Sequence, residues 1–370
     1  MERQGRVCVS SLAGLTFGKY HITAHPPDEA HPFAMFDALA ECVRDTRAQI
    51  VAQFVFGGSE IGADRMRDLE RAAGPVNWPV TWIHADDHSG IEMTGTQAYA
   101  VADTPIRSVI LDGRVVGSCF ADEYAEYCLL GDLLPMDTAA SREVQTRSVF
   151  EQCEAALRTV GMDFSHVMRT WLYLDGLLDW YDEFNAVRTR FFEERGVFNG
   201  LLPASTGIGI ANRHGSALVM DAMAIRPKDP RVLIQTVASP LQCPATHYRS
   251  SFSRAVEIVV PGHRQLHISG TASIAPDGAS VHQGDIRGQI AKTMEVVATI
   301  LKSRGMDWSN TTRGIAYCKR LEDAATVQRC MREYTAGSLS IALAHADICR
   351  PELLFELELD ASAETFRPRT

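Results

Sequence analysis

Gly161-Met162-Asp163-Phe164-Ser165 is the stretch that decides the fold of this 370-residue chain, because it returns as Gly305-Met306-Asp307-Trp308-Ser309. Three further residues recur at the same offset of 144 positions: Arg169, Tyr173 and Gln145 return as Arg313, Tyr317 and Gln289. A solenoid repeat is much shorter, about 20–50 residues. The sequence therefore predicts a duplicated domain, and a difference between the copies becomes informative about function.

The composition is that of an ordinary globular protein, with 46% hydrophobic and 22% charged residues. At this length the chain can hold two or three domains. The formal net charge of −10 argues against a nucleic-acid partner, since nucleic-acid-binding domains usually present a basic face. No apolar run reaches the roughly 18 residues of a membrane span, and residues 1–6 do not lead into a signal-type apolar core. We therefore expect no membrane partner.

Cysteine and histidine spacing predicts neither disulfides nor a metal site. The nine cysteines are odd in number and form no CxxC pair, which favours reduced thiols in a cytoplasmic protein. The twelve histidines form no HExxH motif, and His282 and His345 are more readily explained as surface residues than as metal ligands. We expect no metal.

Hydrophobic periodicity gives both copies the same order of elements. In the first copy we expect a hairpin over 108–120, a strand over 124–130, a helix over 141–160, a strand over 167–174, a helix over 177–193 and a strand over 217–225. In the second we expect strands over 253–260 and 265–269, a turn at 277–278, a helix over 285–304, a strand over 314–318, a helix over 323–334 and a strand over 353–359. Each copy is thus an α+β layer of order β-β-β-α-β-α-β, a mixed sheet with two helices on one face.

The remaining segments are an extension and a linker. Residues 1–100 show no counterpart in the second copy, and we expect two helices in them, over 36–46 and 62–73, before an extended stretch at 80–84. The four-proline segment 226–244 is interpreted as the linker. The predicted divisions are an N-terminal extension over 1–100, a first domain over 101–235 and a second over 245–365. The open face of each sheet needs cover, which fused copies can supply by packing together or as a pseudo-oligomer.

The closing strands of the two copies differ at one carboxylate. Matching Asp221 to Glu358 by alternation places Val219 opposite Glu356. Glu356 and Glu358 then share one face of the strand, and an acid in an apolar strand is costly unless it is paired or functional. A solvated edge strand is the simpler explanation. However, copy one folds with Val219, so the sheet does not require Glu356.

Cationic and small residues gather in the second copy. The segment 248–254 (Tyr-Arg-Ser-Ser-Phe-Ser-Arg) reads either as a loop with a strand start or as an anion site, because guanidinium groups grip carboxylates bidentately. The segment 270–273 (Gly-Thr-Ala-Ser) suggests close backbone approach to a ligand, or a bulge. Lys319, Arg320 and Arg350 lie at predicted strand ends, and their charges either converge on a small polyanion or are scattered over the surface.

These features together resemble the Rid (YjgF) superfamily and, within it, the chorismatases. The superfamily likeness rests on the order of elements, the Gly-Met-Asp-aromatic-Ser stretch and the closing Glu-Leu-Glu of 356–358. The chorismatase likeness rests on four segments: 239–244, 248–254, 268–274 and 349–356. It covers roughly residues 80–361.

The resemblance implies hydrolysis of chorismate with release of pyruvate and without a metal or organic cofactor. It implies a pocket in the second copy, with the first copy as scaffold, and Glu356 as the catalytic acid. Such an acid must stay protonated near neutral pH, which burial beside Glu358 would favour. The candidate substrate-binding residues are Tyr248, Arg249, Ser253, Arg254, Thr271, Ala272, Lys319, Cys349 and Arg350. Within the family, residues at the positions of Ala272 and Cys349 vary with the product, and the mixed pattern favours a hydroxybenzoate over a diol.

Two other functions stay open on the sequence. A Rid-type enamine or imine deaminase would carry an arginine about 15 residues before Glu356, where this chain has Ile341, and copy one has Ala204 at the matching place and Val219 for the acid. A non-catalytic ligand-binding protein would keep the same scaffold, since fold alone does not fix function. A monomer and a homotrimer are both compatible with the sequence.

Overall fold

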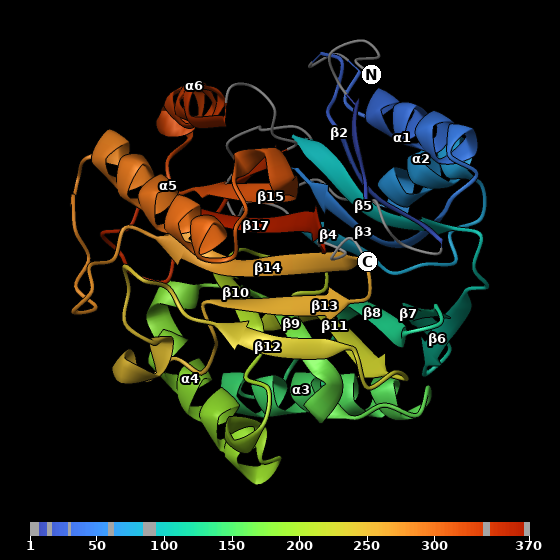
Figure 1. The fold of residues 1–370 in the computed structure, drawn as a ribbon, viewed down its shortest axis with the longest axis horizontal. Helices are drawn as coiled ribbons and strands as arrows, with labels where there is room; N and C mark the ends of the chain where they lie inside the picture. Colours follow the sequence, from blue (N-terminus) through green and yellow to red (C-terminus); the bar gives the residue numbers. More distant parts are fainter. Residues whose placement is uncertain are drawn as a thin grey trace, which may run out of the picture.

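Three β-sheets, each covered by a pair of helices, make up the computed structural model of the chain (Figure 1). The described residues are 7–12, 17–28, 31–57, 63–83, 94–335 and 341–365. Within them, no helix is both long and apolar enough to cross a membrane. The predicted α+β class, with tandem copies of one layer, is confirmed.

The first copy forms a six-stranded sheet of order β10-β9-β11-β8-β7-β6. Its elements are β6 (Arg107–Leu111), β7 (Arg114–Ala121), β8 (Ala125–Leu133), α3 (Arg142–Arg158), β9 (Val167–Leu174), α4 (Leu177–Glu194), β10 (Ala204–Gly209) and β11 (Leu218–Pro227). The predicted order is confirmed except that β10 was missed. This short strand pairs in parallel with β9 at the sheet edge, and it contains two glycines, which weaken a strand signal.

The second copy repeats this sheet in the order β12-β13-β14-β17-β15-β16. Its elements are β12 (Leu233–Val237), β13 (Ala255–Val260), β14 (His263–Ala272), α5 (Ile286–Ser303), β15 (Thr311–Cys318), α6 (Ala324–Thr335), β16 (Ile341–His345) and β17 (Phe355–Glu364). The interpretation of 226–244 as a linker is wrong in part, because β12 is an edge strand paired with β13. The parallel edge strand β16 was missed as well.

The described residues between 7 and 102 form a third sheet of the same topology. Its elements are β1 (Val7–Ser11), β2 (Gly18–Ala24), α1 (Ala34–Asp45), β3 (Gln49–Phe56), α2 (Ala63–Ala73), β4 (Val80–Ile83) and β5 (Gly95–Ala102). The order β1-β2-β5-β3-β4 reproduces β13-β14-β17-β15-β16, with one edge strand fewer. The prediction that this segment lacks a counterpart is therefore wrong for its fold, although it lacks the repeated Gly-Met-Asp stretch. Gly62 and His84, which bounded two predicted elements, lie outside the described residues.

The repeated Gly-Met-Asp stretch turns the chain from a helix into the inner strand that follows, β9 or β15. Gly161 and Gly305 adopt positive φ values of 75° and 67°, a conformation that favours glycine. Asp163 and Asp307 then cap short 3₁₀ turns by accepting hydrogen bonds from the backbone N–H two residues on, at 2.9 and 2.8 Å. The stretch recurs because both copies make the same turn.

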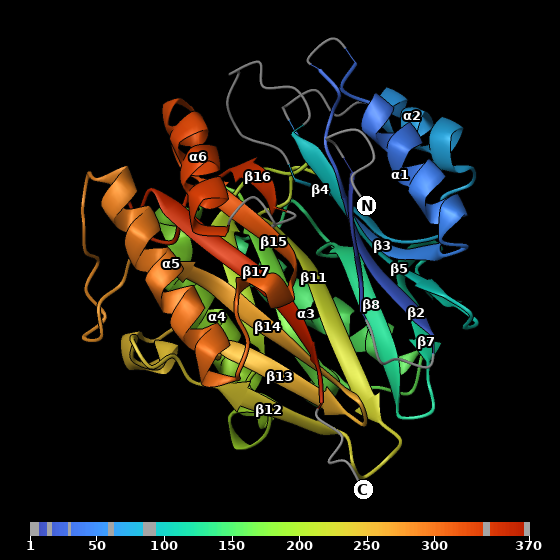
Figure 2. The same cartoon turned by 45° about the horizontal axis from the view of Figure 1, so that its top comes forward.

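The three sheets face one another, and the helices lie outside (Figure 2). One central apolar cluster draws side chains from all three sheets, including Phe54, Trp171 and Ile315. Three outer clusters each pack one helix pair against its own sheet. Strand alternation separates these layers, so that Leu357 and Leu359 face the helices while Glu356 and Glu358 face the interior.

Strand register confirms the alignment of the closing strands. Asp221 pairs with Trp171 and Glu358 pairs with Ile315, and Trp171 and Ile315 are themselves 144 residues apart. Val219 is thus the counterpart of Glu356. The exact domain bounds stay a prediction.

The duplicated arginines meet at a single acid. Arg169 Nη2 lies 3.0 Å from Glu358 Oε2, and Arg313 Nη2 lies 2.8 Å from Glu358 Oε1. Trp171 donates a further hydrogen bond to Glu358 Oε1 at 2.9 Å. All of these side chains are buried. Glu358 therefore ties the copies together, and its charge lies two residues from Glu356.

Candidate active site

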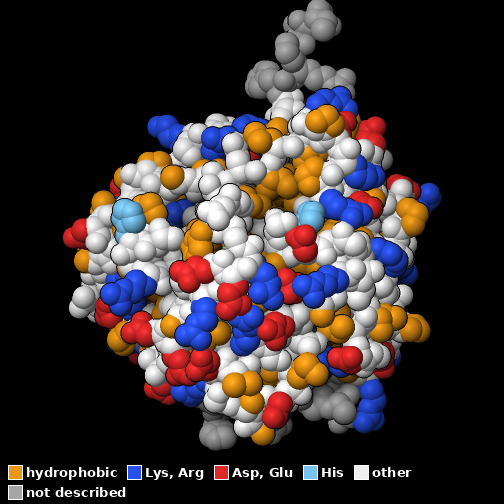
Figure 3. Space-filling model, turned by 90° about the horizontal axis from the view of Figure 1, so that it is seen from below, with side chains coloured by type: hydrophobic (Ala, Val, Ile, Leu, Met, Phe, Trp, Pro, Cys, Tyr) orange, Lys and Arg blue, Asp and Glu red, His pale blue; other side chains and the backbone are white. Residues whose placement is uncertain are grey.

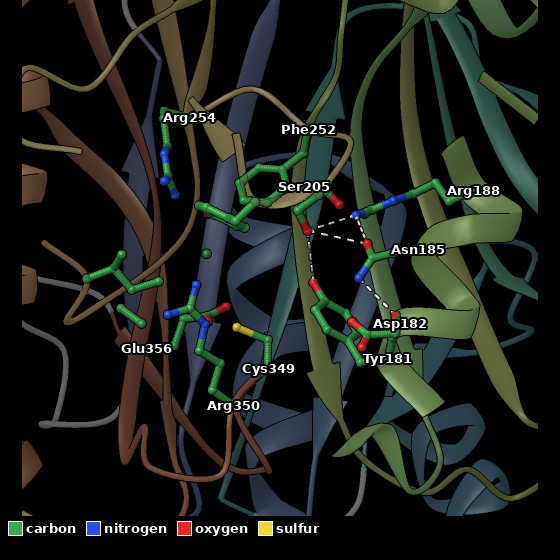
Figure 4. A pocket seen from close by; sticks show the side chains of 16 residues that line it. Tyr181, Asp182, Asn185, Arg188, Ser205, Phe252, Arg254, Cys349, Arg350 and Glu356 are labelled. Atoms are coloured by element: carbon green, nitrogen blue, oxygen red, sulfur yellow. Dashed lines mark hydrogen bonds between the residues drawn. The ribbon is translucent and has the colours of Figure 1, made fainter. Parts of the chain in front are cut away.

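A cavity of about 160 Å³ opens between the first and second copies (Figure 4). The second copy lines it with Tyr248, Ser250, Phe252, Arg254, Gly270, Ala272, Ile274, Cys349, Arg350 and Glu356. The first copy lines it with Tyr181, Asp182, Asn185 and Arg188 from α4 and with Ser205 and Gly207 from β10. The pocket was predicted in the second copy with the first copy as scaffold. The second copy supplies most of the lining, and the first copy also builds one of the walls.

Glu356 lies on β17 at the floor of this cavity and is only 4% exposed. Burial raises the pKa of its carboxyl to about 8, and the charge of Glu358 acts in the same direction. Arg169 and Arg254 oppose the shift, with smaller effects. Within the described part of the chain, the carboxyl accepts no hydrogen bond. Glu356 is thus a neutral acid at pH 7 whose oxygens are available to a ligand.

Gly270 gives the Glu356 carboxyl its space. A Cβ atom at position 270 would lie 2.0 Å from Glu356 Oε1, far inside van der Waals contact. The pairing of β14 with β17 shifts register between Ile268 and Thr271, so a bulge brings Gly270 to the acid. The Gly270 N–H is anchored by donation to Thr206 Oγ1 at 3.1 Å. The sequence suggested that the backbone at 270–273 approaches a ligand closely. In the structure the Gly270 backbone approaches the Glu356 side chain instead.

Three arginines surround the cavity. Arg254 donates from Nε and Nη2 to the carbonyl oxygen of Cys243, at 3.1 and 2.8 Å. Arg350 donates from Nη1 to the carbonyl oxygen of Gly278 at 2.8 Å. Arg188 donates from Nη2 to Asn185 Oδ1 at 2.5 Å. Among the described residues, none of the three guanidinium groups forms an ion pair with a carboxylate, so their charge is left for a ligand.

This concentration of positive charge contrasts with the rest of the molecule. The chain is net acidic at −10. On the face seen from below in Figure 1, where α3 and α4 lie, acidic and basic side chains are interspersed (Figure 3). Field lines focus in a cavity with low-dielectric walls, so three cations there attract an anion more strongly than the same charges spread over a surface.

Tyr248 and Cys349 complete the wall beside Glu356. The Tyr248 ring lies between two guanidinium groups, with its centroid 5.4 Å from Cζ of Arg254 and 5.3 Å from Cζ of Arg350. Burial raises the pKa of the Tyr248 phenol and raises the pKa of the Cys349 thiol to about 12. Both groups are neutral at pH 7, so Arg254 and Arg350 carry the charge of this wall.

Six of the ten predicted site residues line the cavity: Tyr248, Arg254, Ala272, Cys349, Arg350 and Glu356. The other four do not. Arg249 is exposed, and Lys319 binds the carbonyl oxygen of Pro351 and Asp347 Oδ1. Ser253 and Thr271 donate to the backbone carbonyls of Ala255 and Ser269. For Thr271 the reason is strand alternation, which directs Gly270 and Ala272 toward the cavity and the residue between them away.

Four cavity-lining residues that were not predicted lie in the second copy, within the segments 248–254 and 268–274, and the others come from the first copy. Tyr181, Asn185 and Arg188 follow one another at helical spacing and form one face of α4. The helical spacing of these polar residues is visible in the sequence, but only the packing of copy one against copy two shows that they face Glu356. Ser205 and Gly207 lie on β10, the strand that was itself missed.

The chain is similar to several proteins named as chorismatases. Residues 121–224 match the family model described as "Chorismatase FkbO/Hyg5-like, N-terminal". A chorismatase of Streptomyces hygroscopicus is 29% identical over 223 residues, which cover 54% of this chain and 62% of that protein. A chorismatase of Streptomyces rapamycinicus is 29% identical over 238 residues, covering 58% and 68%. A 3-hydroxybenzoate synthase of Streptomyces hygroscopicus is 25% identical over 225 residues, covering 53% and 63%.

A solved structure extends the likeness in fold to nearly the whole chain. A crystal structure of a chorismatase superimposes with a TM-score of 0.65, covering 96% of this chain and 100% of the other at 19% identity. At that identity the match shows the fold alone. It includes the third sheet, whose topology was absent from the sequence prediction.

Proposed function

We propose that this relative of the chorismatases hydrolyses chorismate, releasing pyruvate and a ring carboxylic acid. The observation that supports this most directly is a buried carboxyl with a pKa of about 8 in a cavity lined by three arginines, none of which pairs with an acid among the described residues. Binding and hydrolysis of chorismate require both features. It is a dianion, and its enol ether is cleaved by acid.

The arginines suit the two carboxylates of such a substrate. A guanidinium group presents parallel N–H donors that match a carboxylate, and it stays charged at any physiological pH. Arg254 and Arg350 are held by backbone carbonyls, which fix their positions without neutralising them. A fixed cation costs little reorganisation when the anion arrives.

Glu356 supplies the proton. Transfer from its carboxyl to the methylene carbon of the enol ether gives an oxocarbenium-like carbon, which a water molecule attacks. The resulting hemiketal collapses: the bond between the former enol ether carbon and the ring oxygen breaks, the ring oxygen takes up one proton of the water, and the water oxygen becomes the keto oxygen of pyruvate. One proton returns to Glu356, so the acid is regenerated and one water molecule is consumed for each chorismate.

The ring product follows from what happens next. Hydrolysis alone leaves a dihydroxycyclohexadiene carboxylate, and loss of one water molecule from that ring leaves a hydroxybenzoate. Ala272 and Cys349, the two positions associated with product type, both line the cavity. We propose a 3- or 4-hydroxybenzoate product, a choice that the similarity to a protein named 3-hydroxybenzoate synthase supports. We further propose a cytoplasmic location, which nine cysteines without a disulfide among them favour.

The direct test is pyruvate release from chorismate by the purified chain, followed through lactate dehydrogenase and the loss of NADH. We expect pyruvate, and chromatography of the same mixture then identifies the ring product. Ammonia from an imino acid without pyruvate would instead assign the protein to the deaminases. Chorismate binding without either product would leave a ligand-binding protein.

The pH profile tests the protonation state of Glu356. The acid form is present below a pKa of about 8 and is lost above it, so kcat/KM for chorismate should be level near pH 7 and fall about tenfold per pH unit well above 8. The Cys349 thiol, with a pKa of about 12, stays neutral through this range. A profile that rises with pH through 8 would contradict the assignment of Glu356 as an acid.

A further inference from the structure

Arg188 is a buried cation held by neutral groups. It lies on α4 of the first copy, is 2% exposed, and donates from Nη2 to Asn185 Oδ1 at 2.5 Å and to Ser250 Oγ at 3.2 Å. Its guanidinium carbon lies 5.1 Å from the centroid of the Phe184 ring. Its Nε has no hydrogen-bond partner in the described part of the chain. Every contact is thus with an uncharged group, although the side chain carries a full charge.

Burying such a charge is expensive without a counter-ion. Isolated ionised groups in a protein interior cost several kcal/mol after relaxation, and buried arginines are normally paired. Arg169 and Arg313, two buried arginines of the same region, show the normal pattern, since both pair with Glu358. Arg254 is buried as well and, like Arg188, lines the cavity without a carboxylate partner among the described residues. Arg188 thus differs from the two paired arginines in lining the cavity. The missing counter-ion is therefore expected to arrive with a ligand.

The position of Arg188 identifies which part of the ligand it meets. Figure 4 shows Arg188, Asn185 and Tyr181 on the wall opposite Glu356 and Arg254. Under the proposed function, Glu356 must reach the enol ether methylene, which places the pyruvyl end of chorismate against Glu356. Arg254, whose charge acts on Glu356, is then the partner of the pyruvyl carboxylate. The ring projects across the cavity toward α4.

We infer that Arg188 binds the ring carboxylate of the substrate, and that the first copy thereby selects six-membered rings that carry this group. This inference rests on the proposed function for its choice of ligand. Asn185 and Ser250 act as positioning residues, because they accept from Arg188 and hold its guanidinium at the cavity wall. The substrate spans the junction of the two copies, with its pyruvyl end on the second and its ring acid on the first.

Calorimetric titration with 3-hydroxybenzoate and with pyruvate tests the inference without requiring turnover. We expect Arg188→Met to weaken binding of 3-hydroxybenzoate about 30-fold or more, the usual effect of removing one partner of a buried charge pair, and to leave pyruvate binding unchanged. KM for chorismate should rise by a similar factor, with a smaller change in kcat. The thermal midpoint should not fall, since the variant removes an uncompensated buried charge.

Arg190→Met is the matched control. Arg190 lies two residues further along α4, is exposed, and pairs with Glu143 at 3.5 Å. It should leave the binding of both ligands unchanged. Unchanged 3-hydroxybenzoate affinity in folded Arg188→Met would overturn the inference, as would a lowered thermal midpoint with normal affinity, which marks a structural residue.

Two further measurements keep the inference testable. If Arg188→Met does not fold, methyl 3-hydroxybenzoate on the wild-type chain serves instead, and equal binding of ester and acid would exclude a cation at the ring carboxylate. The inference and the proposed reaction can also fail separately. If the wild-type chain released no pyruvate from chorismate but Arg188→Met still lost 3-hydroxybenzoate binding, the carboxylate site at Arg188 would stand and the proposed reaction would be wrong.

Discussion

We expect Glu356→Gln to lower kcat for pyruvate release at least about 100-fold, the scale of a lost general acid. Gln matches the neutral carboxylic acid in shape and polarity, and Glu356 is neutral at pH 7 because its pKa is about 8. The cavity should therefore keep its form and still bind chorismate. Stopped assays of pyruvate give kcat, and titration of the inactive variant with chorismate gives Kd. The fall in kcat/KM above pH 8 should vanish from any residual activity.

Asp221→Asn is the control for this variant. Asp221 is also a buried acid whose pKa burial raises to about 8, and it occupies the Glu358 position of the first copy. It accepts hydrogen bonds from Thr81 Oγ1 at 2.7 Å and from the Asp132 N–H at 2.8 Å, which an amide oxygen can also accept. We expect near-normal turnover. A large loss in Asp221→Asn, or normal turnover in Glu356→Gln, would mean that the wrong acid has been assigned.

Gly270→Ala should lower the activity almost as much, although the variant removes no ionisable group. The added Cβ would lie 2.0 Å from Glu356 Oε1 and 2.9 Å from Cδ, so the carboxyl must move. A displacement of about 1 Å at a reacting group can cost about 100-fold in rate. We expect a loss of that order in kcat, and a decrease of about 1–3 kcal/mol in the free energy of unfolding from the overpacking. Chemical denaturation and pyruvate assays measure the two effects.

Gly207→Ala separates this steric clash from a general effect of filling the cavity. Gly207 also lines the cavity, but a Cβ there would meet only Tyr181 Oη at 3.8 Å and Cε2 at 4.0 Å, which are ordinary contacts. It should retain most of the activity. Equal losses in both variants would show that cavity volume, and not the position of Glu356, limits the rate.

The local turns and the duplication could be predicted because their causes are local. The Gly-Met-Asp stretch specifies a positive-φ glycine and an aspartate cap wherever it occurs, so the two copies were visible at 161 and 305. Strand alternation likewise put Glu356 and Glu358 on one face. The third sheet was hidden because its topology recurs without that stretch, and the same layer can be built from other apolar residues.

The sequence by itself determined the α+β repeat, the alignment of its closing strands and Glu356 as the acid in which the copies differ. Only the tertiary structure decided what surrounds that acid. The cavity forms where two separate sheets meet, so Arg188 and Tyr181 reach it from a helix more than 160 positions from Glu356, a distance over which no periodicity carries information. The raised pKa of Glu356 has the same origin, because burial between the sheets, and not any neighbour in the chain, is its largest cause.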